Sequence, residues 1–98
     1  MYLYNVTVII ESGVQDAVRQ RIEAQLFGHS DTGTPVKLLQ MLDSPHEGAT
    51  LCIQLHTETT EGIAAFQQHR LAPIQELTNR EYPGKVLFFD STMKYLND

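Results

Sequence analysis

Residues 4–13 read YNVTVIIESG, the pattern of a β-strand that runs directly into the start of a helix. Side chains alternate across a pleated strand, so the residues form two sets that face opposite ways. One set is apolar or aromatic and comprises Tyr4, Val6, Val8 and Ile10. The other set is mixed and comprises Asn5, Thr7 and Ile9. The first face suits a core, and the second raises the question of what covers it.

The length and composition predict a small globular protein. A chain of 98 residues has enough surface to bury for one core only, so we expect one domain that spans residues 1–98. The chain is 42% hydrophobic and 19% charged, which is typical of a soluble protein rather than of a disordered one. It should therefore fold.

The charge balance argues against two classes of partner. Seven Lys and Arg against twelve Asp and Glu give a formal net charge of −5, the wrong sign for binding nucleic acid or an anionic membrane surface. The N-terminus lacks the basic and apolar zones of a signal peptide, and no apolar run is long enough to span a bilayer. The single cysteine, Cys52, fits a reducing compartment. We expect a cytoplasmic protein.

A helix should follow the first strand, which we place at residues 2–10. Ser12 and Gln15 have the spacing of a capping box, and Gly28 is placed to end the helix in a left-handed conformation. Residues 29–35 have the composition of a loop. The apolar stripe of this helix comprises Val14, Val18, Ile22 and Leu26.

Two further strands are predicted at residues 36–43 and 49–57, joined by a hairpin connection, and a last strand at residues 85–96. Between them lies a second helix, capped by Thr59 or Thr60. Pro73 should kink this helix or divide it, because proline removes a backbone hydrogen bond and clashes with the preceding turn. Its predicted stripe comprises Ile63, Phe66, Arg70, Ile74 and Leu77.

The order of elements is therefore β-α-β-β-α-β. Right-handed crossovers limit this order to an α+β, ferredoxin-like fold with a four-stranded antiparallel sheet. The expected strand order is 4-1-3-2, and both helices should lie on one face.

The other face of the sheet should then be half apolar. Leu51, Ile53 and Leu55 would meet the helices, which leaves Cys52, Gln54 and His56 on the far side. In the last strand we expect Leu87, Phe89 and Met93 to face inward, and Val86, Phe88, Asp90 and Thr92 to face outward. The candidate pocket or interface residues are Asn5, Thr7, Gln54, His56, Phe88 and Asp90. A second copy of the chain is the expected partner, because two-fold dimers are the commonest assemblies and a sheet face can be self-complementary.

Three segments carry a resemblance to a known family: YNVTV at the start, EGATLCIQL after the hairpin, and LAPIQELTNREYPGKVLFFDSTMKYL at the end. Together they resemble a family of small proteins of unknown function within the dimeric α+β barrel superfamily. The resemblance implies a ferredoxin-like fold and a homodimer. It implies no activity and no cofactor.

Candidate chemistry centres on His56, which Asn5, Gln54 and Asp90 could hold and tune near neutral pH. The simpler interpretation is a histidine that fills an interface. Cys52 is too far along the strand from His56 to form a nucleophile pair. The histidines lack the paired spacing of a zinc site, so no metal is expected, although Asp43, His46 and Glu47 cluster in the hairpin.

An acylphosphatase-like phosphate loop is excluded at residues 12–21, because Asp16 would place a carboxylate where the phosphate binds. Three function classes remain. The first is a homodimeric interaction or small-ligand-binding module without catalysis. The second is a cofactor-free, monooxygenase-like enzyme with Asn5, His56 and Asp90 as pocket residues. The third is a ligand-binding regulatory domain of the kind usually joined to a DNA-binding helix-turn-helix, a segment that this sequence does not carry. The sequence leaves the ligand, and whether the protein is an enzyme, open.

Overall fold

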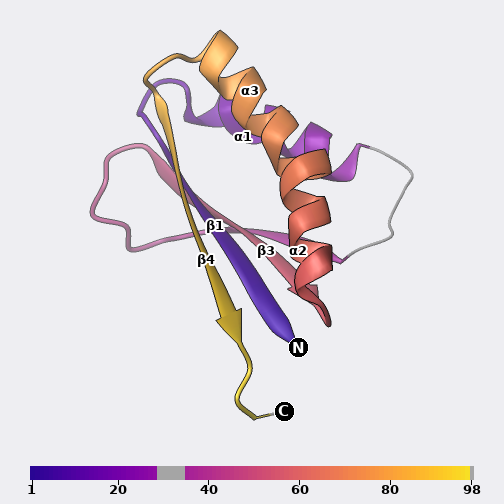
Figure 1. The fold of residues 1–98 in the computed structure, drawn as a ribbon. Coiled ribbons are helices and arrows are strands. Elements are labelled where there is room, and N and C mark those ends of the chain that lie inside the picture. The colour runs from indigo at the N-terminus through magenta and orange to yellow at the C-terminus, as the bar shows by residue number, and fades with distance from the viewer. Residues whose placement is uncertain (29–34, 98) are drawn as a thin grey trace.

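A computed structural model describes residues 1–28 and 35–97 and has the predicted β-α-β-β-α-β order (Figure 1). The predicted loop at residues 29–35 lies outside the described residues except for Pro35. The elements are β1 (Tyr2–Ile10), α1 (Gln15–Phe27), β2 (Val36–Gln40), β3 (Ala49–Thr57), α2 (Thr60–Phe66), the π-helical turn η1 (Gln67–Leu71), α3 (Ala72–Glu81) and β4 (Val86–Lys94).

The four strands form one antiparallel sheet in the order β2-β3-β1-β4, which is the predicted order read from the opposite edge. β1 lies in the middle and pairs along its whole length, with Tyr2 opposite Thr57 on one side and Lys94 on the other. The helices all cover the same face of this sheet (Figure 1). The ferredoxin-like prediction is confirmed.

The core lies between that face and the helices. The alternate residues of β1 predicted to face inward are at most 1% exposed: Tyr4, Val6, Val8 and Ile10. They meet Val18, Ile22 and Leu26 from α1, and Ile63, Phe66, Leu71 and Ile74 from the second helical segment. No helix among the described residues has both the length and the apolar character needed to cross a bilayer.

Two predictions about the ends of α1 are wrong. Val14 occupies the N-cap position without a side-chain hydrogen bond, so Ser12 does not cap the helix. Ser12 lies inside a tight turn in which Val14 N–H donates to the Glu11 carbonyl, and Gly13 adopts a φ of 101° that favours glycine. At the other end Gly28 has a φ of −78°, so α1 ends without the left-handed residue that we expected.

The second helical segment is divided as Pro73 predicts. α3 begins at Ala72 with proline in its first turn, and because Pro73 has no N–H it cannot donate to a carbonyl of the preceding turn. Ahead of it, η1 contains one extra residue per turn, and Ala72 N–H donates to the carbonyl of Gln67, five residues earlier. The widened turn allows the chain to pass the proline without losing its helical course.

Thr59 is the residue that caps this segment. Its side-chain Oγ1 accepts a hydrogen bond from the backbone N–H of Gly62 at 3.2 Å. Thr60 is the first residue inside the helix and is exposed. The sequence alone left the two threonines equivalent.

We expect Thr59→Ala to lower the free energy of unfolding by about 1 kcal/mol, because it leaves one amide at the helix start without its acceptor. Urea denaturation followed by circular dichroism measures this change. Thr60→Ala is the matched control and should change stability by less than half as much. Equal effects of the two substitutions would contradict the assigned cap.

Candidate functional site on the open face of the sheet

The face of the sheet turned away from the helices is here called the open face. β1 contributes Leu3, Asn5, Thr7 and Ile9 to it, and β3 contributes Cys52, Gln54 and His56, as the sequence predicted. All seven are half-buried within the single chain. None of the described helices packs over them, since all helices lie on the other side (Figure 1).

The predicted phase of the last strand is wrong. Val86 pairs with Ile10, Phe88 with Val8, and Asp90 with Val6. Directly paired residues point to the same face, so Val86, Phe88 and Asp90 lie on the helix side with the buried residues of β1. Phe88 and Asp90 are therefore not open-face residues. The sequence VLFF is apolar at both parities, so alternation alone did not distinguish the two phases.

The corrected phase makes the open face more apolar than expected. Leu87, Phe89 and Met93 of β4 point to it and are 55%, 57% and 45% exposed. Leu39 of the opposite edge strand β2 pairs with Cys52 and is 45% exposed. Apolar side chains thus occupy both edges of the open face.

A short polar track crosses the middle of this face. Gln54 Nε2 donates to Asn5 Oδ1 at 3.2 Å, and Asn5 Nδ2 donates to Thr7 Oγ1, also at 3.2 Å. Asn5, Thr7 and Gln54 are therefore brought together and linked by these two hydrogen bonds. Their amides and hydroxyl offer hydrogen-bonding groups but no titratable one.

His56 lies in a separate position and has a partner that the sequence did not reveal. Tyr95 Oη lies 3.2 Å from His56 Nδ1, and the two rings stack with centroids 5.9 Å apart. The predicted phase of the last strand would have turned Tyr95 to the helix side. Only the correct phase of that strand would have indicated Tyr95 as the partner of His56. Beside the pair, a hollow of about 250 Å³ is lined by Leu3, Met93, Lys94, Tyr95 and Leu96.

Asp90 forms a different polar contact, on the helix side. Tyr4 Oη donates to Asp90 Oδ2 at 2.5 Å, and Gln67 Nε2 donates to Tyr4 Oη at 3.1 Å. This bridge connects β1, β4 and η1. Burial of the phenol, together with its hydrogen bond to the carboxylate, raises the pKa of Tyr4 from 10.0 to about 12.

The predicted grouping of Asn5, His56 and Asp90 is therefore not formed, because Asp90 lies across the sheet from the other two. The hairpin residues Asp43, His46 and Glu47 are all exposed. In residues 1–28 and 35–97, no three His, Cys, Asp or Glu side chains lie close enough to hold a metal ion. The chemistry of the open face is mostly apolar contact and neutral hydrogen bonding. Its ionisable side chains include His56 and Lys37, which lies on the edge strand β2 opposite Gln54.

Strand order and helix placement define a protein of the ferredoxin-like class. Residues 1–96 match the model of a family described as a domain of unknown function, DUF4286. The chain belongs to this family. No curated protein matches the sequence.

Solved structures of the same fold are similar over nearly the whole chain at low sequence identity. A MhuD mutant with two manganese protoporphyrin IX molecules bound per active site is 11% identical, with a TM-score of 0.64 and coverage of 100% of this chain and 97% of that one. A dabb family protein from Mesorhizobium loti is 13% identical, with a TM-score of 0.57 and coverage of 99% and 100%. The de novo designed protein Foldit4 is 8% identical, with a TM-score of 0.62 and coverage of 96% of each chain. These likenesses show the fold.

Tyr4→Phe should lower the free energy of unfolding by about 1 kcal/mol at neutral pH, because it removes the donor of the Asp90 hydrogen bond. The raised pKa of Tyr4 means that folding favours the protonated phenol. That contribution is complete below pH 10 and is lost as the pH rises through about 12. Urea unfolding between neutral pH and pH 12 measures both effects.

Tyr2→Phe, on the same strand and the same face, is the control and should keep the alkaline loss of stability. Because lysines also titrate in this range, the informative quantity is the difference between each variant and the unsubstituted chain. A Tyr4→Phe protein that loses stability at high pH as steeply as the unsubstituted chain would contradict the assignment.

Proposed function

We propose that residues 1–98 form a single ferredoxin-like domain that works as a cytoplasmic homodimer and serves as a non-catalytic interaction or small-ligand-binding module. The dimer joins two open faces. The lone, half-buried thiol of Cys52 suits a reducing compartment.

The apolar character of the open face is the observation that carries this proposal. Leu87, Phe89 and Met93 form an apolar row along β4, with Leu39 at the opposite edge. Exposed apolar surface of this extent, with polar groups among it, is typical of a protein interface. Two-fold symmetry supplies the same patch from a second copy, so no other partner needs to be invoked.

Pairing of two open faces would also place the polar track in a defined environment. Two sheets packed face to face lie about 10 Å apart, a space that side chains fill. Asn5, Thr7 and Gln54 form two hydrogen bonds with one another within each chain, so part of their hydrogen-bonding capacity is met before they enter that space. The ligand-binding part of the proposal draws support from the MhuD structure, where the same fold holds a bound porphyrin.

The monooxygenase-like alternative loses its only acidic pocket group. Asp90 accepts a hydrogen bond from Tyr4 on the helix side, and the remaining pair of His56 and Tyr95 lies at the surface of the single chain. General acid-base chemistry needs converging groups in an enclosed pocket, so the non-catalytic module is the better supported function.

Phe89→Glu should convert the dimer into a monomer at micromolar concentration, because it places an unpaired carboxylate in the proposed interface. Light scattering over a dilution series measures the mass. Phe27→Glu is the matched control: Phe27 lies on α1, away from the open face, and is 51% exposed compared with 57% for Phe89. The control should remain a dimer.

Two results would overturn the proposal. The first is an unsubstituted chain that is already monomeric at these concentrations. The second is a dimer that Phe89→Glu leaves intact, since the copies would then meet through another surface.

A further inference from the structure

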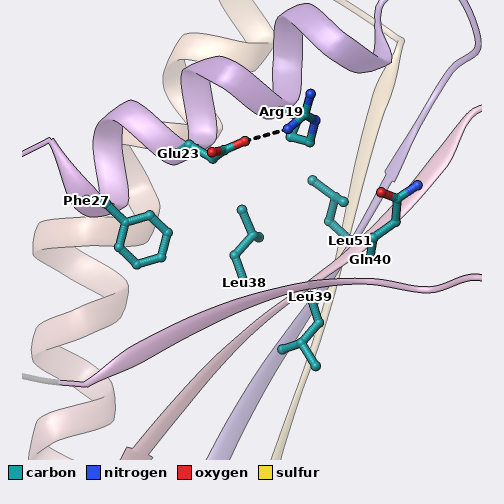
Figure 2. Close-up of a pocket in the computed structure, with 7 residues that line it drawn as sticks. All are labelled: Arg19, Glu23, Phe27, Leu38, Leu39, Gln40 and Leu51. Carbon is teal, nitrogen blue, oxygen red and sulfur yellow. Dashed lines mark hydrogen bonds and ion pairs between the residues drawn. The ribbon is translucent and has the colours of Figure 1, made fainter.

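A second hollow lies on the helix side of the molecule, between α1 and the edge strand β2 (Figure 2). It has a volume of about 310 Å³, within the range of about 300–1,000 Å³ that is typical of small-molecule sites. Its lining residues are Arg19, Glu23, Phe27, Leu38, Leu39, Gln40 and Leu51. We call it the α1–β2 groove.

The interior of the groove is apolar. Leu38 rises from β2 and Leu51 lies deeper, on β3, while the ring of Phe27 closes the end nearest the C-terminus of α1 (Figure 2). Leu51 is 1% exposed and belongs to the core, so it lies under the floor of the groove and presents almost no surface to it. Leu39 points away from it, toward the open face (Figure 2).

The lip of the groove carries one charge of each sign. Arg19 Nη1 lies 2.9 Å from Glu23 Oε1, one turn away on α1, and the amide of Gln40 lies on the opposite wall (Figure 2). The two charged side chains are 43% and 45% exposed. A pair of this kind stabilises a helix by only about 0.3–0.5 kcal/mol, so both charges remain available to a ligand.

The other ion pair of α1 has a different character. Arg21 donates to both carboxylate oxygens of Glu81, at 2.9 and 3.1 Å, and so ties α1 to α3. It does not line the groove. The Arg19–Glu23 pair lies within α1 and links it to no other element. It differs from the Arg21–Glu81 pair in lying over an apolar hollow.

We propose that the α1–β2 groove binds a free α-amino acid with an apolar side chain, of the size of leucine. The ligand carboxylate would meet Arg19 and its ammonium group would meet Glu23. The side chain would lie against Leu38 and Phe27. A zwitterion matches the two lip charges at once and leaves neither unpaired, whereas a ligand with one charge satisfies only one of them.

This inference rests on the ligand-binding part of the proposed function and names its ligand class. It does not require the dimer, because the groove lies on the helix side and only Leu39 at its rim also belongs to the open face. The two proposals can therefore fail separately.

Titration calorimetry of the full chain with four compounds tests the inference. L-Leucine carries both charges and the apolar body, isocaproate lacks the ammonium group, isoamylamine lacks the carboxylate, and glycine lacks the apolar body. We expect saturable binding of leucine, with a Kd lower by about tenfold or more than that of each other compound, as expected for the loss of one charged hydrogen-bonding group or of the apolar contact.

Substitution of the lip charges locates the site. Arg19→Gln and Glu23→Gln should each raise the Kd for leucine by about tenfold or more while the chain stays folded, because the pair contributes little to stability. Arg21→Gln removes the same charge from the same helix away from the groove and should leave the Kd unchanged.

The inference is overturned if leucine does not bind, if isocaproate, isoamylamine or glycine binds as tightly, or if Arg21→Gln weakens binding as much as Arg19→Gln. Light scattering of the same samples reports on the proposed function independently. A monomer that binds leucine would remove the homodimer and leave the groove assignment standing, whereas a dimer that binds none of the compounds would remove the assignment alone.

Discussion

Burial of the alternate side chains of β1 against the helices is the interaction on which the rest of this structure depends. Val6, Val8 and Ile10 are fully buried, and each such side chain stabilises the fold by about 1.5–3 kcal/mol. Because a small domain has a net stability of only about 5–15 kcal/mol, losing this contact would leave little to hold the sheet and the helices together. β1 also pairs with both neighbours, so its phase fixes which side of β3 and β4 meets the core.

This constraint also separates the two faces of the sheet by chemistry. The helix side contains the half-buried polar bridge of Tyr4 and Asp90, while the open face contains the neutral track of Asn5 and Gln54. The residues that β1 presents at the centre of the open face are neutral, and the charge of Lys37 lies on the edge strand β2. One face of the sheet thus packs against the helices to form the core, and the other is the face proposed to meet a second copy. The α1–β2 groove lies on the helix side, away from that proposed interface.

Much of the fold could be predicted from the sequence, because periodicity reports the environment of a side chain directly. The alternation in β1 and β3 placed residues 4–10 and 51–56 on the correct faces. Alternation failed in β4, because consecutive apolar residues do not show which of them face the core. This error placed Phe88 and Asp90 on the wrong face and concealed the contact of Tyr95 with His56. The α1–β2 groove was also missed, since a hollow depends on the separation of two elements that are distant in the sequence.

The π-helical turn accounts for one more discrepancy in the sequence pattern. Phe66 and Leu71 are both buried although they lie five residues apart, a spacing that a regular helix would turn about 140° out of alignment. The extra residue in η1 corrects this mismatch, so the segment carries two apolar stripes of different phase that both reach the same sheet. A single period fitted across the segment placed Arg70 in the stripe, whereas Arg70 in fact donates to the carbonyl of Leu26 at the end of α1. The extra residue in η1 thus shifts the phase of the apolar stripe, so that α2 and α3 both pack on the same face of the sheet.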